Sequence, residues 1–272
     1  MLGKETMPQN IYDDQDFFEG YRRLRDGDSG LNGSVEEPAV IGLLPDLGGR
    51  SVLDLGCGFG DFCRFARSRG AVRVVGIDVS QRMIDAAKSR TMEAGIEYQR
   101  HAIEEFGIEL PAYDCVVSRL AFHYVKNLDS VFRAIYSGLR DRGVFVFAVE
   151  HPVCTALCSG WIENDRGDQL HWPVDRYWDE GERQQKWFVE GVIKFHRTVQ
   201  TYVDLVLKSG FVLTRLLEPH ASAEILLRRP HLGTTVRRPA LLVIAAQKIP
   251  NQAPEPTATA VTPPAAQEPR QP

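Results

Sequence analysis

Residues 52–60 read Val-Leu-Asp-Leu-Gly-Cys-Gly-Phe-Gly, and the fold class of the chain can be inferred from this stretch. Residues 52–55 form a short apolar run with one acid, as is typical of a buried parallel strand. Three glycines at alternate positions follow, and apolar residues at helical spacing then predict a helix that begins near Asp61. A strand, a glycine turn and a helix in this order indicate a nucleotide-binding crevice. Glycines let the backbone approach a ligand, and the helix start offers free N–H groups.

A second buried strand is predicted at residues 74–78, and it ends in Asp78. A carboxylate at this place can accept hydrogen bonds from both ribose hydroxyls of a nucleoside. Two cofactor classes fit these features, the nicotinamide dinucleotides and S-adenosylmethionine. The dinucleotide fingerprint needs a third small residue three positions after the second glycine, and Asp61 stands there. Asp54, two residues before the first glycine, instead suits a ligand with a cationic amino acid end.

Residues 54–60, together with Gly-Ile-Asp-Val-Ser at 76–80, resemble the first two motifs of class I S-adenosylmethionine-dependent methyltransferases. The similarity covers roughly residues 50–150. It is strongest to the small-molecule branch that includes the ubiquinone/menaquinone and biotin-pathway methyltransferases. The resemblance implies an α/β fold with a doubly wound, Rossmann-like, seven-stranded sheet. The sheet is expected to be mostly parallel with an antiparallel last strand, and S-adenosyl-L-methionine is the implied cofactor.

The resemblance also implies a set of cofactor-binding residues. They are Tyr21 in an N-terminal cap, Asp54, Gly56, Cys57 and Gly58 in the glycine turn, Asp78, Val79 and Met83 after the second strand, Ala102, Ile103 and Glu104 after the third, and Ser118 in the fourth. The family commonly has an Asp at the position of Ala102. This departure leaves the adenine amino group to the backbone or to Glu104, while Ile103 can pack on the ring.

Composition limits the class of protein and its partners. The 272 residues allow one large domain, and 43% hydrophobic with 25% charged residues is ordinary for a soluble globular protein. A net charge of −4 gives no electrostatic support for binding nucleic acid. Five scattered cysteines do not form a disulfide framework, which favours a cytoplasmic location. No run reaches membrane-spanning length, and the sequence leaves the oligomeric state open.

Three regions are expected along the chain. Residues 1–34 form an N-terminal segment whose aromatic stripe either packs on the core or caps the cofactor. Residues 35–248 form the methyltransferase domain, with a helix at 35–47, last strands at 211–217 and 240–247, and a helix-free connection between them. Residues 249–272 are a Pro- and Ala-rich tail that cannot bury enough apolar surface to become ordered.

An inserted lid is expected at residues 153–195, because large aromatic and charged residues mix there without periodicity. It holds all four tryptophans, Trp161, Trp172, Trp178 and Trp187. They can form a small core of their own or line an acceptor pocket. The arginines at 228, 229, 237 and 238 are interpreted as a solvated turn, with an anion-binding patch as the alternative. No metal site is expected, because the cysteine and histidine spacings near the lid do not match the usual zinc pairs.

His151 and His196 flank the lid at the ends of predicted elements, so both are candidate general bases, with a structural hydrogen bond as the alternative for each. Enzymes that methylate the exocyclic amines of bases carry an Asn or Asp followed by two prolines and an aromatic residue at this place. Residues 118–121 of this chain read Ser-Arg-Leu-Ala instead. The predicted function is methylation of a small-molecule acceptor on oxygen or nitrogen. A dinucleotide-dependent oxidoreductase and a non-catalytic, methyltransferase-like binding protein remain as alternatives.

Overall fold

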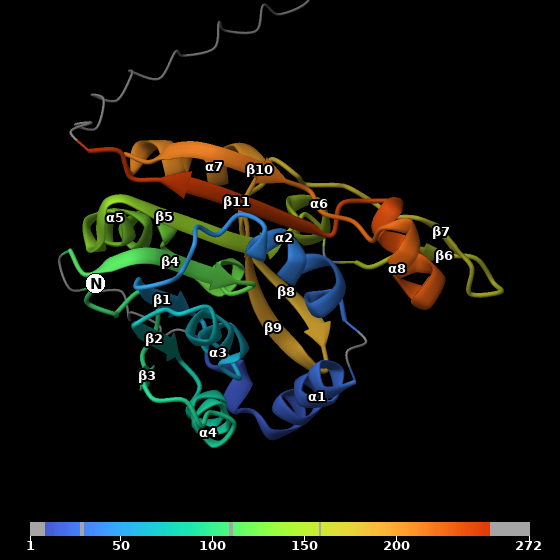
Figure 1. Ribbon diagram of the computed structural model, residues 1–272. Helices are drawn as coiled ribbons and strands as arrows, with labels where there is room; N and C mark the ends of the chain where they lie inside the picture. The colour runs from blue at the N-terminus through green and yellow to red at the C-terminus, as the bar shows by residue number, and fades with distance from the viewer. Residues whose placement is uncertain (1–8, 28–29, 109–110, 158, 251–272) are drawn as a thin grey trace, which may run out of the picture.

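A seven-stranded sheet lies at the centre of the protein (Figure 1). The computed structural model describes residues 9–27, 30–108, 111–157 and 159–250. In spatial order the strands are β10 (Val212–Leu217), β11 (Leu241–Gln247), β5 (Leu139–Glu150), β4 (Tyr113–Arg119), β1 (Ser51–Leu55), β2 (Arg73–Asp78) and β3 (Ile96–Arg100). Neighbouring strands are parallel except at β11, the last strand in the chain, which runs antiparallel to β5 and β10. The predicted sheet is therefore confirmed.

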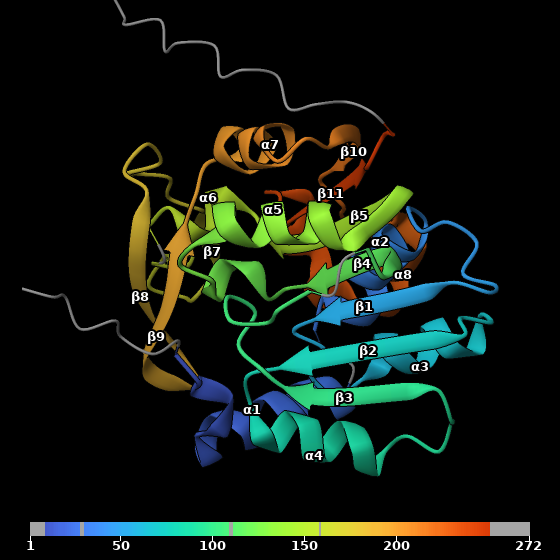
Figure 2. The ribbon, with the colours of Figure 1, turned by 90° about the vertical axis from the view of Figure 1, so that its left-hand side faces the viewer.

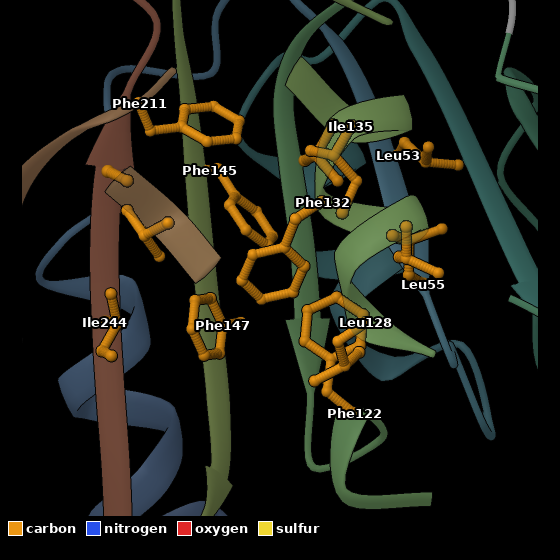
Figure 3. Close-up of a cluster of buried hydrophobic side chains, with 14 of the residues drawn as sticks. Leu53, Leu55, Phe122, Leu128, Phe132, Ile135, Phe145, Phe147, Phe211 and Ile244 are labelled. Atoms are coloured by element: carbon orange, nitrogen blue, oxygen red, sulfur yellow. The ribbon is translucent and has the colours of Figure 1, made fainter. Parts of the chain in front are cut away.

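Side-chain alternation along the strands divides the core into two layers. On one face, Leu53 and Leu55 of β1 belong to the same buried cluster as Phe145 and Phe147 of β5 (Figure 3). On the other face, Val52 belongs to a second cluster. Because helices cover both faces, β1 is buried along its whole length, including its two polar residues, Ser51 and Asp54.

Helices pack against both clusters. The helices α2 (Glu37–Ile41), α3 (Asp61–Ser68) and α4 (Gln81–Ser89) contribute to the second cluster, and α5 (Leu128–Gly138) and α7 (Val199–Lys208) contribute to the first. The α4 helix begins after Ser80, whose hydroxyl accepts a hydrogen bond from the Met83 N–H at 3.1 Å. Thr198 caps α7 in the same way through the Thr201 N–H, also at 3.1 Å. Both predicted N-caps are confirmed.

Two predicted elements are wrong. The connection between β10 and β11 is not helix-free, because it contains α8 (Ala223–Arg228) and a 3₁₀ helix at Pro230–Val236. Ser222 provides the N-cap of α8, and Leu232 of the 3₁₀ helix is buried in a small third cluster. The predicted helix at 35–47 is instead a π-helix at Asn32–Glu36 that continues as α2 and ends at Ile41.

The predicted lid consists of one short helix and two hairpins. The helix α6 (Pro152–Thr155) follows β5, and the hairpins are β6 (Ile162–Glu163) with β7 (Gln169–His171), and β8 (Gly181–Trp187) with β9 (Val189–His196). Figure 2 shows the β8–β9 hairpin crossing the carboxyl ends of the central strands, with α1 (Gln15–Asp26) at its far end. Among the described residues, no helix has the length and apolar character needed to cross a bilayer.

Candidate functional site

The glycine turn after β1 opens onto a cavity at the carboxyl ends of the strands. Gly56, Gly58 and Gly60 have φ angles of 80°, 52° and 74°, in the left-handed region that favours glycine. A Cβ atom on Gly58 would meet nothing within 4 Å, so the backbone at this position faces open space. A Cβ on Gly56 would lie 2.4 Å from the Cβ of Ala121, so this glycine is required by the packing of the protein itself.

Asp78 joins the end of β2 to the glycine turn. One carboxylate oxygen accepts a hydrogen bond from the Gly58 N–H and the other from the Ser80 N–H, both at 2.9 Å. Burial raises the pKa of Asp78 to about 6, even though these two N–H groups favour the ionised form. These two hydrogen bonds hold the carboxylate at the edge of the cavity, and Asp78 ends β2 as predicted.

Asp54 lies in the interior, with 1% of its surface exposed. Its Oδ2 accepts a weak hydrogen bond from the Cys63 thiol at 3.3 Å, while Oδ1 is buried and has no partner among the described residues. Burial raises the pKa of Asp54 to about 7, although the nearby Arg119 guanidinium opposes this shift. A buried, unpartnered carboxylate oxygen fits a ligand that carries an ammonium group.

Most of the predicted cofactor-binding residues gather around this space, which we call the turn cavity. It consists of two adjoining hollows. The larger is lined by Tyr21, Gly56, Gly58, Asp78, Val79, Met83, Ala102, Ile103 and Glu104, with Tyr12, Arg119, Leu120 and Tyr124 among others. The smaller adds Asp54 and Cys57. Ser118 is the exception, because it is fully buried and its hydroxyl donates to the Leu55 carbonyl at 2.9 Å.

Arg119, the residue after Ser118, lines both hollows and was missed by the sequence interpretation. Its guanidinium forms a bidentate ion pair with the fully buried Glu36, with contacts between 2.5 and 3.1 Å, and also contacts Glu37 at 3.1 Å. Burial would lower the pKa of Arg119, but Glu36 outweighs that effect and raises it. The signal in the sequence was an arginine at the end of a largely buried strand.

The N-terminal segment closes one side of the turn cavity. Asp13 accepts hydrogen bonds from the Ser80 hydroxyl at 2.6 Å and from the Arg82 N–H at 3.1 Å, at the start of α4. Gln9 pairs with the lid, accepting from the Ile193 N–H at 2.9 Å and donating to the Gly191 carbonyl at 3.1 Å. The segment therefore links α4 to the β8–β9 hairpin.

A second cavity, which we call the lid cavity, lies between the sheet edge and the inserted segment. Its volume is about 550 Å³. Its lining includes Tyr12, Tyr21, Leu120, His123, Tyr124, Glu150, Cys154, Trp172, Lys186, Trp187 and Arg238. Tyr12, Tyr21, Leu120 and Tyr124 line the turn cavity as well, so the two spaces share a wall.

Comparison with known proteins establishes the family. A family model described as a methyltransferase domain matches residues 52–143. The solved structure of an S-adenosylmethionine dependent methyltransferase from Mesorhizobium loti is 37% identical, covers 80% of this chain and 100% of that chain, and has a TM-score of 0.75. The chain belongs to the class I S-adenosylmethionine-dependent methyltransferases. This membership removes the dinucleotide oxidoreductase alternative, and the cofactor of the methyltransferase is S-adenosylmethionine.

Two other relatives show how far the similarity of this methyltransferase extends. A Haemophilus influenzae protein described as uncharacterized is 32% identical over 252 residues, which is 88% of this chain and 97% of that protein. The ubiquinone biosynthesis O-methyltransferase of Chromobacterium violaceum is also 32% identical, but over 105 residues, or 38% of this chain and 45% of that enzyme. The chain thus matches less than half the length of a relative whose printed name gives a reaction.

The two histidines expected to act as bases do not line either cavity of the methyltransferase. The Nε2 of His151 lies 2.8 Å from Glu218, and its Nδ1 accepts from the Val153 N–H at 3.1 Å. The Nδ1 of His196 lies 2.8 Å from the Thr155 hydroxyl, and its Nε2 lies 2.9 Å from the Tyr177 carbonyl. Both ring nitrogens of each histidine are engaged, as the structural alternative expects, and the role of general base stays a prediction.

A buried ion pair stands beside the lid cavity instead. The Lys194 ammonium lies 2.5 Å from Glu150 and only 1% of its side chain is exposed. Burial would raise the pKa of Glu150, but the charge and hydrogen bond of Lys194, together with the charges of other neighbours that include Arg238, outweigh burial, so the pKa is lowered. His123 is neutral, because burial lowers its pKa to about 4. Its Nδ1 accepts a hydrogen bond from the Glu150 N–H at 3.4 Å.

Of the four lid tryptophans, two line the lid cavity, one packs against another tryptophan and one is exposed. Trp172 and Trp187 line the lid cavity, whereas Trp161 packs edge-on against Trp172 with ring centroids 5.5 Å apart. Trp178 is 78% exposed. Arg237 is exposed, as the interpretation of a solvated turn expects, although it stacks on Trp161. That interpretation does not hold for Arg238, which is half-buried against Trp172.

Cofactor affinity is expected to rise with pH between about 5 and 8. Asp54 and Asp78 have pKa values of about 7 and 6, both raised by burial, so Asp54 is largely protonated below about pH 6 and Asp78 below about pH 5. A cationic ligand favours their ionised forms, so binding should lower both pKa values and release protons. Calorimetric titration with S-adenosylmethionine in two buffers of different ionisation enthalpy measures this release. A pH-independent affinity without proton release would contradict the assignment of Asp54 and Asp78 to cofactor binding. Asp54→Asn should remove the part of the pH dependence that is centred near pH 7.

Proposed function

We propose that this methyltransferase transfers a methyl group to an oxygen or nitrogen of a small-molecule acceptor bound in the lid cavity. The observation that carries the proposal is a shared wall. Tyr12, Tyr21, Leu120 and Tyr124 line the lid cavity and the larger hollow of the turn cavity, and Asn32 lines the lid cavity and the smaller hollow. The two cavities are therefore adjacent, so a cofactor in one and an acceptor in the other would lie next to each other. The lid cavity also falls within the roughly 300–1,000 Å³ of typical small-molecule sites.

The residues of the turn cavity are assigned to the three parts of the cofactor. Asp78 accepts hydrogen bonds from the ribose hydroxyls, and Asp54 receives the ammonium group through its unpartnered oxygen. Arg119 faces the carboxylate of the amino acid end, while Ile103 and Glu104 border the adenine. The bound cofactor supplies a methyl group activated by its sulfonium charge.

The lid supplies positioning and the exclusion of water. Orientation of two bound reactants can lower a barrier by roughly 7–11 kcal/mol. Among the described lining residues, Glu150 is placed to accept a hydrogen bond from an acceptor hydroxyl or amine, because its carboxylate stays ionised beside Lys194. Its lowered pKa makes it a weak base, so positioning contributes more than proton transfer.

Transfer from methyl-labelled S-adenosylmethionine tests the proposal. The enzyme is incubated with a metabolite extract filtered to remove macromolecules and, separately, with the retained proteins and nucleic acids. Label is expected in the small-molecule fraction, and Trp187→Ala should reduce it at least tenfold while S-adenosylhomocysteine affinity changes less than threefold. Label confined to the macromolecular fraction would contradict the proposal. No transfer to either fraction would favour the non-catalytic binding protein.

A further inference from the structure

Three charged side chains line the lid cavity, and two of them are neutralised by a neighbour. Glu150 pairs with Lys194 at 2.5 Å, and Lys186 pairs with Glu190 at 2.9 Å. The third is Arg238, which forms no ion pair with any described residue. The cavity therefore carries one uncompensated positive charge within the part of the chain that the structure describes.

The guanidinium of Arg238 is held in place but only partly satisfied. It stacks on Trp172, with its central carbon 3.9 Å from the ring centroid, and the Trp172 indole N–H donates to the Val153 carbonyl at 3.0 Å. Its Nη1 donates to the Cys154 sulfur at 2.8 Å. Its Nε is buried and has no partner, and Nη2 forms no hydrogen bond within the described residues.

The neighbouring Arg237 shows what a purely structural arginine looks like in the same segment. It stacks on Trp161 at 4.5 Å, and its two terminal nitrogens donate to the Gln169 carbonyl at 2.9 Å and the Leu170 carbonyl at 2.6 Å. It does not line the lid cavity. Arg237 therefore stacks on a tryptophan while both of its terminal nitrogens have hydrogen-bond partners. Stacking does not explain why donors of Arg238 lack partners.

We propose that Arg238 binds a carboxylate or phosphate group of the methyl acceptor, so that the acceptor is an anion. This inference rests on the proposed function of the lid cavity. Adjacent N–H groups of a guanidinium form a planar fork that matches the oxygens of such anions, and the Nε–Nη2 edge is the unoccupied one. The stacked Trp172 fixes the guanidinium and borders the space for the rest of the acceptor.

The position of Arg238 also separates the anionic group from the methylated atom. Arg238 lines the lid cavity but not the turn cavity, whereas methyl transfer requires the shared wall around Tyr12 and Tyr124. The anionic group therefore orients the acceptor, and a different oxygen or nitrogen receives the methyl group. Formation of a methyl ester at the recognised anion is not the reaction that this arrangement favours.

Titration with simple aromatic probes tests the proposal. The intact protein, saturated with S-adenosylhomocysteine, is titrated with benzoate, phenyl phosphate and the neutral benzyl alcohol, and tryptophan fluorescence reports binding. At least one anion should bind at least tenfold more tightly than benzyl alcohol, and the preferred anion distinguishes carboxylate from phosphate. Arg238→Met should abolish this preference and Arg238→Lys should retain part of it, whereas the matched control Arg237→Met should leave it unchanged.

The outcomes separate this inference from the proposed function. Unchanged S-adenosylhomocysteine affinity in Arg238→Met shows that the variant is folded. Equal binding of all three probes, no binding of either anion, or an anion preference that survives Arg238→Met would overturn the role of Arg238. Methyl transfer to the small-molecule fraction is measured independently, so its presence or absence bears on the proposed function alone.

Discussion

Replacing Asp78 with alanine is expected to weaken S-adenosylmethionine binding at least tenfold while the protein stays folded. A hydrogen bond to a charged group contributes about 1.5–3 kcal/mol, so loss of two bonds to the ribose would weaken binding by a factor on the order of 10²–10⁴. The variant also frees the Gly58 and Ser80 N–H groups that Asp78 holds, which loosens the glycine turn. Calorimetric titration measures the affinity, and circular dichroism checks the fold.

Asp114 provides a matched control for this experiment. Its carboxylate also accepts a hydrogen bond from a strand, at 2.8 Å from the Ser51 N–H, but it lies near the start of β4, away from both cavities. Asp114→Ala should leave the cofactor affinity unchanged. If Asp78→Ala binds as tightly as the wild type, the carboxylate does not hold the ribose. Equal losses in both variants would indicate a general loss of structure.

Glu150→Gln is expected to lower the thermal unfolding midpoint by on the order of 10 °C. The substitution leaves the Lys194 ammonium buried without its partner, which typically costs about 3–5 kcal/mol, and each kcal/mol shifts the midpoint by about 2–4 °C in a domain of this size. Differential scanning calorimetry measures the shift. Because the pKa of Glu150 is lowered, the stabilisation is present at neutral pH and is lost only on acidification through that lowered value.

A double-mutant cycle identifies the ion pair as the cause. Lys194→Met combined with Glu150→Gln removes both charges. The unfolding midpoint of this double variant should fall by much less than the sum of the decreases in the two single variants. The exposed pair Lys186–Glu190 on the same hairpin is the control, and Lys186→Met should hardly change the midpoint. Strictly additive losses in the cycle would show that the pair contributes nothing as a pair.

Short-range sequence accounts for the cofactor half of the site. The strand before the glycine turn, the positive φ angles of Gly56 and Gly58, and the position of Asp78 all follow from local patterns of a few residues. The cap residues Ser80 and Thr198 could be recognised for the same reason. The periodicity of apolar side chains and the steric limits of the backbone act within a single helix, strand or turn. These features can therefore be predicted without knowing the tertiary contacts of the chain.

Residue type alone was misleading where the hydrogen-bond partners lie far along the chain. His151 and His196 have the chemistry of a base, but both ring nitrogens of each lie within hydrogen-bond distance of a partner. Only one of these partners, the Val153 N–H, is close in sequence. Arg119 resembled an ordinary strand-end arginine, yet its partner Glu36 lies 83 residues earlier in the chain. A titratable group takes its role from its surroundings, and sequence does not list those surroundings.

The sequence was sufficient for the fold class, the family resemblance and most of the residues around the turn cavity, because each depends on local pattern and on motifs in one continuous stretch. The lid cavity depended on long-range packing. This packing brings side chains from distant parts of the chain to the same cavity: Glu150 from β5, Trp172 and Trp187 from the two hairpin regions, and Arg238 from the segment before β11. Irregular aromatic and charged segments carry no periodicity, so which of their side chains face one another is fixed only when the hairpins pack across the sheet.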